Sequence, residues 1–495
     1  MSMEKEKKHP SVFEPFAIVL NLAVSVVGAI IGIQIVTTLG VTPSTSIIGA
    51  LVAMLIARIP MELFRKYKSI HRQNLMQTSI SSATFGAANS LLIPIGIPFI
   101  MGKTELILPM LIGAALAMFI DATLLYKLFD SRIFPARESW APGVATAESI
   151  LAGDKGGKRA GLLGIGALIG VIGSVLKIPM SALGVAFIGN IWALTMFGVG
   201  LLINQYSMPL FQLDVGKLYI AHGIMIGAGI VALIQVAVLI FKREDSAAEA
   251  SKENEAVTVP MRSVKRTLGL GYVAYLAVAV IIAVLGGLMT KMSAGMLIGF
   301  IIFAAFAAFF HELIVGIAAM HSGWFPAFAD MGYDLKTGYI LRGNGSDKEL
   351  EIRGRKQQYY TGMIAFGVAL LTVVLTYKGF FGQNLVPPID KVYASTINAG
   401  ASLDVAMKLL IWAIPCAIIQ WIGGPNRQLG VMLATGLLIV SPNACWAVLG
   451  GILIRVAVLK IKGKEAESTM SILAAGFIAG DALYSFFTSV FKASK

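Results

Sequence analysis

Long apolar stretches dominate the pattern of hydrophobic and polar positions in this chain of 495 residues. Each stretch has few charges and holds about 18 residues or more, roughly the length that an α-helix needs to cross a ~30 Å hydrocarbon core. Short polar connectors separate the stretches. We therefore predict about 14 transmembrane helices. They begin near Phe16, Ser46, Leu75, Ile107, Ala160, Met180, Lys217, Leu268, Ser293, Tyr359, Val405, Leu429, Asn443 and Met470.

One apolar stretch, residues 139–161, is too broken for a membrane-spanning helix and too apolar for a surface loop. Pro142 interrupts any helix before it, and Gly153 interrupts any helix after it. The roughly two to three turns that remain, residues 144–152, carry Glu148. In a membrane protein, such a half-helix lies inside protein or beside a water-filled cavity, where its free backbone groups find partners. We expect a transporter to hold its substrate there.

Composition supports a membrane location. Hydrophobic residues make up 57% of the chain and charged residues only 14%, and the mean hydropathy is +0.79. The chain is therefore more apolar than soluble domains are. The net charge of +13 comes from Lys and Arg in short connectors, the pattern of cytoplasmic loops in membrane proteins. We predict a multi-pass protein of the plasma membrane with a cytoplasmic N-terminus, and no nucleic acid partner.

A polar segment divides the chain into two parts. Residues 242–266 are rich in Ala, Ser and Glu and lack apolar periodicity, so we predict a flexible cytoplasmic linker. The first transmembrane half is then 1–241 and the second is 267–495.

The two halves carry similar features. Gly49 and Glu62 in the first half recur with the same spacing as Gly299 and Glu312 in the second, and a GIMIG motif near the end of the first half recurs as GFIAG. Nearly equal offsets at both ends indicate a parallel repeat. We therefore expect two pseudo-symmetric halves related by an axis along the membrane normal.

The second half has its own interrupted apolar segment, residues 321–342. Asp334 precedes Gly338 in it, much as Glu148 precedes Gly153 in the first half. Adding these two discontinuous or re-entrant segments to the spanning helices gives about 16 elements. The predicted fold is an all-α polytopic membrane protein.

Acidic side chains on the interrupted segments are the leading candidates for substrate or proton coupling. A carboxylate inside a membrane domain is costly, so it faces a cavity or a partner. Glu148 and Asp334 are therefore the first choices, because a substrate ammonium group or a coordinated metal would meet them there. The alternative is that each acid caps a helix or pairs with Lys158 or Lys336.

Other ionisable residues give weaker candidates. Glu62 either contributes to the site or ends a span at the cytoplasmic face, where basic residues follow it. His311 and Glu312 lie together in an apolar span and form either a proton relay or a satisfied core pair. An H-E-x-x-H zinc motif is absent because Val315 stands where the second His is needed.

Polar residues near the acids complete the candidate set. Gln73, Asn74 and Gln77 open a predicted helix and either line a pathway or join helices by hydrogen bonds. Tyr333 either contacts a substrate or lies at the membrane interface, where aromatic residues are common. Lys336 follows Asp334 in the same segment. No metal site or cofactor is predicted, since the two cysteines lie in apolar spans and fit no metal spacing.

Several motifs resemble those of the oligopeptide transporter family, in its prokaryotic branch, which is related to the yellow stripe-like metal-chelate transporters. They are APGVATAESILAG with GGKRAG after it, the DLKTG motif that begins at Asp334, QNLMQT at Gln73, KQQ at Lys356 and GFIAGDAL at Gly476. The resemblance implies a proton-coupled secondary transporter that imports small peptides, metal chelates or siderophores by alternating access. Its partners would be the substrate, protons and the lipid bilayer.

Two other functions stay open as alternatives, a passive channel and a membrane-embedded enzyme. The sequence offers no nucleophile constellation, metal-ligand cluster or nucleotide loop for an enzyme, and we predict that the protein is not an enzyme. A channel would not require two interrupted acidic helices. The sequence leaves open whether peptides or chelates are carried and whether the protein forms a homo-oligomer.

Overall fold

A computed structural model of the protein describes most of the chain. The described residues are 9–39, 45–241, 258–290, 298, 301, 320, 327–388, 390–391, 394, 403–424, 427, 429–438 and 443–493. This part contains 17 α-helices and no β-strand, which confirms the all-α prediction. Six spans in it are long and apolar enough to cross a membrane. The helix predicted near Ser293 and the candidates His311 and Glu312 lie outside the described residues.

The first half of the chain contributes helices of very different lengths. In order they are α1 (Pro15–Leu39), α2 (Thr45–Ala57), the 3-10 helix η1 (Glu62–Lys68), α3 (Ile70–Phe85), the π-helix η2 (Gly86–Leu92), α4 (Ile93–Ile100), the 3-10 helix η3 (Thr104–Leu106), α5 (Ile107–Leu128), α6 (Ala141–Lys155), α7 (Gly157–Val175), α8 (Met180–Ile188), α9 (Ile191–Phe211) and α10 (Ile220–Phe241).

The second half contributes the remaining helices. These are α12 (Met261–Thr290), α14 (Ala327–Leu341), α15 (Lys348–Gly382), α17 (Leu403–Gly423), α18 (Leu429–Leu438), α19 (Ala444–Lys462) and α20 (Ala466–Ala493). Helix α12 begins inside the predicted linker, so the last residues of that segment are helical.

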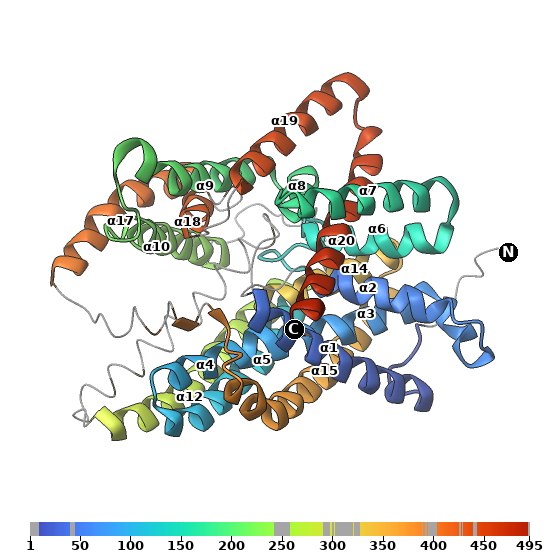
Figure 1. Ribbon diagram of the computed structural model, residues 1–495, viewed down its shortest axis with the longest axis horizontal. Helices are drawn as coiled ribbons and strands as arrows, with labels where there is room; N and C mark the ends of the chain where they lie inside the picture. The colour runs from blue at the N-terminus through green and yellow to red at the C-terminus, as the bar shows by residue number, and fades with distance from the viewer. Residues whose placement is uncertain are drawn as a thin grey trace.

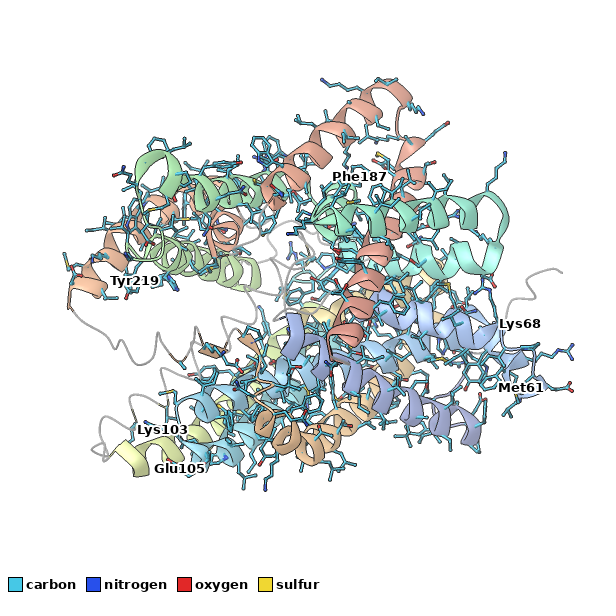
Figure 2. All side chains as sticks on the ribbon, in the orientation of Figure 1. Met61, Lys68, Lys103, Glu105, Phe187 and Tyr219 are labelled. Atoms are coloured by element: carbon cyan, nitrogen blue, oxygen red, sulfur yellow. The ribbon has the colours of Figure 1, made fainter. Side chains whose placement is uncertain are left out.

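One long span lies at the centre of the fold. Helices α3, η2 and α4 form an unbroken run of 31 residues, Ile70–Ile100. Figure 2 shows Met61 and Lys68, which precede this run, at one edge of the molecule, and Lys103 and Glu105, which follow it, at another. Helices α1, α2, α14 and α15 all pack against α3. This central span therefore connects α1, α2, α14 and α15.

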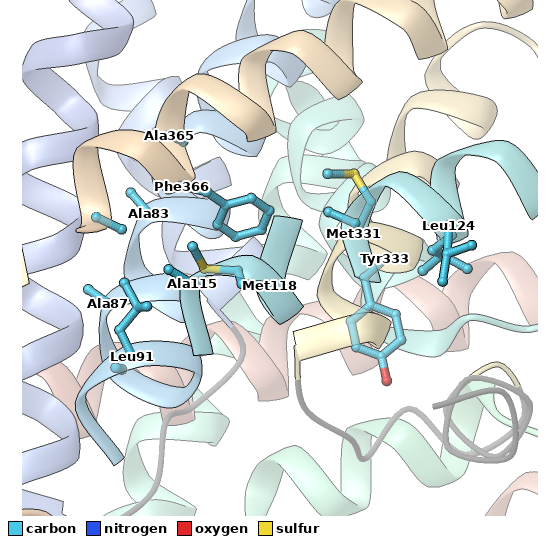
Figure 3. Close-up of a cluster of buried hydrophobic side chains, with 14 of the residues drawn as sticks. Ala83, Ala87, Leu91, Ala115, Met118, Leu124, Met331, Tyr333, Ala365 and Phe366 are labelled. Carbon is cyan, nitrogen blue, oxygen red and sulfur yellow. The ribbon is translucent and has the colours of Figure 1, made fainter. Parts of the chain in front are cut away.

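The helices form two groups around separate apolar cores. One core joins the central span to α5, α14 and α15, with Met118, Met331 and Phe366 among its buried side chains (Figure 3). The other joins α8, α9, α10, α18, α19 and α20. Figure 1 shows α9, α10, α17 and α18 gathered on one side of the molecule and α4, α5 and α12 below them.

Two predicted helix limits are wrong for identifiable reasons. Helix α6 spans 141–155 rather than 144–152, because proline is tolerated in the first turn of a helix and Pro142 stands there. The span expected to begin near Met180 is divided into α8 and α9. Asn190 causes the division, since its side chain accepts hydrogen bonds from the backbone N–H groups of Trp192 and Ala193 and so starts α9.

The glycine motifs near the ends of the two halves each lie at a close contact between helices. Gly227 in α10 faces the backbone of Ala413 in α17 so closely that a Cβ atom would collide with it. Gly480 in α20 faces the backbone of Ala167 in α7 in the same way. Each contact joins helices from different halves of the chain, so the halves interlock rather than pack as separate bundles.

Candidate functional site

The candidate site forms where α3 meets α14. Helix α3 is unusually polar for the centre of a membrane protein, yet every one of its residues from Gln73 to Phe85 is buried. Buried polar groups need partners inside the protein. The polar side of α3 faces α2 and α14, whose side chains supply those partners.

Asp334 is the most enclosed acid of this site. Its side chain is 0% exposed. Oδ1 accepts hydrogen bonds from Ser46 Oγ at 3.0 Å and from Gln77 Nε2 at 2.5 Å, and Oδ2 accepts one from Ser82 Oγ at 3.4 Å. Asn74 donates in turn to Gln77 Oε1 at 3.1 Å. Neutral donors from α2 and α3 therefore hold this carboxyl group.

Asp330 lies one turn before Asp334 on the same face of α14. It is 3% exposed, and its Oδ1 accepts hydrogen bonds from Thr45 Oγ1 at 2.9 Å and from Ser81 Oγ at 3.1 Å. Ser81 Oγ also lies 3.0 Å from Ser46 Oγ, which donates to Asp334. Shared hydroxyl groups thus connect the two acids, and we call Asp330 and Asp334 the acid pair.

The acid pair has no basic partner in the described part of the chain. Neither acid forms an ion pair there. Lys336 is close in sequence but turns away, and its Nζ donates to the carbonyl oxygens of Ala136 at 2.7 Å and Glu138 at 2.8 Å. Buried acids are usually compensated by a cation. Among the described residues, only neutral hydrogen-bond donors compensate the acid pair.

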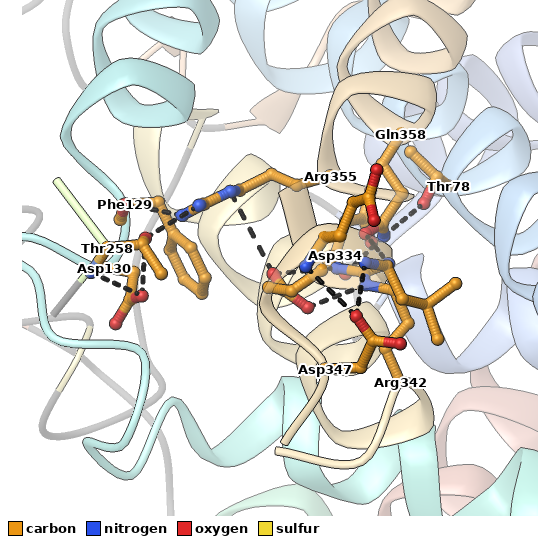
Figure 4. Close-up of polar contacts among 12 residues, drawn as sticks. Thr78, Phe129, Asp130, Thr258, Asp334, Arg342, Asp347, Arg355 and Gln358 are labelled. Atoms are coloured by element: carbon orange, nitrogen blue, oxygen red, sulfur yellow. Dashed lines mark hydrogen bonds and ion pairs between the residues drawn. The ribbon is translucent and has the colours of Figure 1, made fainter. Parts of the chain in front are cut away.

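A second polar network holds the far end of α14 (Figure 4). Gln358 in α15 donates to the backbone oxygen of Asp334 at 2.6 Å and accepts from Arg342 at 2.7 Å. Arg342 also makes two hydrogen bonds to Glu351, at 2.7 and 3.1 Å, and both of these charged side chains are 0% exposed. This network anchors the acid pair to the start of α15.

Two glycines let the helices approach closely enough for these contacts. A Cβ atom at Gly143 in α6 would lie 2.6 Å from the Tyr333 carbonyl oxygen and 2.8 Å from Lys336 Cβ. A Cβ atom at Gly338 would collide with the side chains of Gln358 and Arg342. Larger residues at either position would therefore displace α14.

Comparison with known families identifies the class of protein. The model of the family described as OPT oligopeptide transporter protein matches residues 15–242 and 322–492. The chain belongs to this family. No curated protein and no solved structure matches it. This match confirms the family prediction, and membership of the family makes the protein a membrane transporter.

In this OPT transporter, Glu148 and Asp334, the two leading acid candidates, do not form one site. Glu148 in α6 forms an ion pair with Arg159 in α7 and does not contact the acid pair. Glu62 is 91% exposed in its side chain and lies 3.7 Å from Arg65 at the edge of the molecule. The alternative given for Glu62, an acid at the end of a span, matches this placement.

Some of the other candidate residues of the OPT transporter lie near Asp334, and others lie elsewhere. Gln77 donates to Asp334, and Asn74 donates to Gln77 and supports that contact. Gln73 instead donates to the Lys68 carbonyl oxygen at 3.2 Å and joins α3 to η1. Tyr333 is buried, and its ring packs edge-on to Trp140 with centroids 6.2 Å apart.

Sequence reasoning missed Asp330, Ser46 and Ser81. The spacing of Asp330 and Asp334 was available as a signal, because residues four apart share one helix face. The serines carried no such signal. The structure also shows no group of three His, Cys, Asp or Glu residues that could hold a metal ion among the described residues.

Proposed function

We propose that this OPT transporter is a proton-coupled symporter that imports small peptides or metal-chelate solutes, and that the acid pair is its proton site. The observation that carries the proposal is the burial of Asp330 and Asp334 among neutral donors without a basic partner in the described part of the chain. Ionisable residues in membrane interiors commonly mark proton or ion pathways.

The physical argument concerns charge in a medium of low dielectric constant. Burying an isolated ionised carboxylate is costly, and taking up a proton or pairing with a cation removes that cost. Two such groups one turn apart repel each other when both are ionised, so they form a coupled site that can share a proton. Proton binding would therefore favour the arrangement in which α14 packs on α2 and α3.

The substrate would meet the same surface when α14 separates from α3. Released hydroxyl, amide and carboxylate groups from Ser46, Gln77 and Asp334 would then face the opening, and they suit the ammonium end of a peptide or the polar edge of a chelate. The family supports peptides as the substrate class. A bare metal ion is a weaker choice because the described residues offer no cluster of metal ligands.

The test is uptake into proteoliposomes. A labelled short peptide and a labelled iron chelate are offered with and without an inward proton gradient. Accumulation of either probe above its external concentration, only with the gradient, is the expected result and identifies the substrate class. Equilibration without accumulation would contradict symport and indicate a passive channel.

Two variants connect this result to the acid pair. Asp334→Asn and Asp330→Asn should each lower gradient-driven uptake about 100-fold, since each removes an ionisable group. Glu62→Gln is the matched control, because this acid is exposed at the edge of the molecule and should transport at the wild-type rate. Full activity in both aspartate variants would move the proton site elsewhere.

The cellular placement is part of the same proposal. We place the protein in the plasma membrane with its N-terminus in the cytoplasm, on the basis of the basic connectors. Protease protection of an N-terminal epitope in sealed right-side-out vesicles tests the orientation. Cleavage of the epitope from outside would reverse it.

A further inference from the structure

Asp390 lies near α4, at the other end of the central span from the acid pair. It follows the end of α15, where the ring of Phe381 packs on Phe99 of α4 with centroids 4.8 Å apart. Val386, between α15 and Asp390, is buried. The chain leaving α15 is therefore held against α4, and Asp390 is carried into the protein with it.

The carboxyl group of Asp390 is buried. The residue is 0% exposed, and neither side-chain oxygen has a hydrogen-bond partner among the residues that the structure describes. Charged residues on the elements around it are turned to the surface: Lys103 after α4, Lys378 in α15 and its own neighbour Lys391 are all exposed. No described side chain therefore compensates a negative charge on Asp390.

Gly96 in α4 forms the seat of this carboxyl group. A Cβ atom at Gly96 would collide with Asp390 Oδ2 and would lie 2.9 Å from Asp390 Cγ and 3.1 Å from a methyl group of Val386. Only glycine leaves this room. We call the space above Gly96 that Asp390 and Val386 fill the Gly96 seat.

The chemistry of the Gly96 seat selects its ligand. A hard metal cation takes about six or more oxygen ligands, and the two oxygens of one carboxyl group do not provide them. An ionised carboxylate without a partner is disfavoured in such a place. A proton alone removes this charge, because it converts Asp390 into a neutral acid, which costs far less to bury in an apolar seat than a carboxylate does.

The central span joins this seat to the acid pair. Ser81 and Ser82, which donate to the acid pair, lie on the same unbroken span as Gly96, about 22 Å away along the helix axis. The π-helix η2 lies between them. Such π-helical turns are rare and often occur at functional sites. A movement of the helix at Gly96 could change the hydrogen bonding of η2 or be transmitted through it to Ser81 and Ser82.

We propose that Asp390 is a second proton-binding residue, separate from the acid pair, and that its protonated side chain keeps the chain after α15 docked in the Gly96 seat. Loss of the proton undocks this segment from α4. Only the role of this event in transport rests on the proposed function, since docking itself is measurable without a substrate.

The experiment follows the accessibility of Val386 in the full-length protein. Both native cysteines are replaced (Cys416→Ala, Cys445→Ala), and a single thiol is introduced as Val386→Cys. Its maleimide labelling rate is divided at each pH by the rate of Gln383→Cys, which is at an exposed position just after α15 and corrects for thiol ionisation. We expect this ratio to rise at least tenfold between about pH 5 and about pH 9.

Two further variants decide the cause of that rise. Asp390→Asn, which resembles the protonated acid, should keep the ratio low at every pH. Gly96→Ala fills the seat and should make the ratio high even at about pH 5. A ratio that does not change with pH in the parent, an equal rise in Asp390→Asn, or protection of Val386→Cys in Gly96→Ala would each overturn the proposal.

A last variant separates this inference from the proposed function. Asp334→Asn should lose gradient-driven uptake but retain the pH-dependent labelling of Val386→Cys. If uptake proves independent of the proton gradient while the labelling still depends on Asp390, the proposed symport fails and the proton site at Asp390 stands. If the labelling rate does not depend on Asp390 while uptake is driven by the proton gradient, the proton site at Asp390 fails and the proposed symport stands.

Discussion

The contact between α3 and α14 and the contact between α9 and α18 are both buried in an apolar protein, but different groups hold them together. Between α3 and α14, side-chain hydroxyl, amide and carboxyl groups make the contact. Between α9 and α18, Gly200 and Gly436 bring the two backbones together, and a Cβ at Gly436 would lie 2.9 Å from the Gly200 Cα.

We propose that this difference separates a functional interface, between α3 and α14, from a scaffold contact, between α9 and α18. Small residues that let helices approach closely are the ordinary means of packing helices in a membrane. Buried acids weaken a scaffold unless they are compensated. The described residues of α9, α10, α17 and α18 contain no buried acid, whereas α14 contains two. We infer that α14 tolerates the cost because its acids act in transport.

The largest effect is expected where the polar interface is most charged. Arg342→Gln removes the bidentate partner of buried Glu351 and leaves it Arg355, whose Nε lies 3.9 Å away. Loss of one member of a buried pair costs about 3–5 kcal/mol, and we expect a cost at the lower end of that range because Arg355 remains. Thermal unfolding in detergent should show a large fall in the transition temperature. Arg353→Gln in the same helix region is the control, because its pair with Glu349 is exposed and is worth at most about 1 kcal/mol. Equal effects would contradict a buried Arg342 network.

The contact between α9 and α18 should instead be weakened by added volume at the glycines where the two backbones meet. Gly436→Ala places a methyl group against the backbone of α9, including Leu201 N at 2.8 Å, and overpacking of this kind costs about 1–3 kcal/mol. Uptake per folded molecule should be unchanged. Gly450→Ala has nothing within 4 Å of the new Cβ and should be neutral. A transport defect in well-folded Gly436→Ala would place function in this group of helices too.

A smaller change at the acid pair should affect transport more than folding. Ser81→Ala removes the hydroxyl that donates to Asp330 and touches Ser46, and we expect about a tenfold loss of gradient-driven uptake, which corresponds to ~1.4 kcal/mol. Ser149→Ala is the control, since that buried hydroxyl donates to the carbonyl oxygen of Ala145 in its own helix and to no other described residue. Equal uptake by the two variants would argue against hydroxyl control of the acid pair.

Burial of His9 in the N-terminal segment should make the stability of the protein depend on pH. Burial lowers the pKa of His9 from 6.5 to about 3, with the positive charge of Arg342 as a further cause. The unfolded chain therefore binds more protons, and His9 lowers stability as pH falls below 6.5, by about 1.4 kcal/mol per pH unit until about pH 3. Between pH 7 and pH 5.5, His9→Gln should lose less stability than the parent by roughly that amount. Parallel losses would show that His9 is not buried.

The smallest effect is expected at Glu148. Its partner Arg159 is about a third exposed, so the pair is worth about 1 kcal/mol or less. Glu148→Gln should keep uptake within about threefold of the wild type. A loss as large as that of Asp334→Asn would return Glu148 to the site, as its sequence motif suggests.

The sequence predicts part of this site and misses another part for physical reasons. Asp334, Gln77 and Asn74 stand out because polar residues in apolar stretches are costly. Ser46 and Ser81 do not, because serine is common in membrane helices and its role depends on which helix it meets. Arg342 and Glu351 lie outside the apolar spans, where charge is ordinary, and only the fold shows that both are buried.

The helix pattern shows the same limit. The apolar stretches predict an all-α membrane protein, since length and hydropathy are local properties. The ends of α6 and the division between α8 and α9 depend on Pro142 and Asn190 acting as helix starts. Both residues are equally compatible with a break or a beginning, so tertiary packing decides.

The most direct test of the central claim is proton movement coupled to substrate. Proteoliposomes that enclose a pH-sensitive dye receive the peptide or chelate that the uptake assay selects, without an imposed proton gradient. We expect substrate addition to acidify the interior with the wild type and with Glu62→Gln, and to leave the pH unchanged with Asp330→Asn and Asp334→Asn. Uptake of substrate by the wild type without acidification, or undiminished acidification by both aspartate variants, would contradict a proton site at the acid pair.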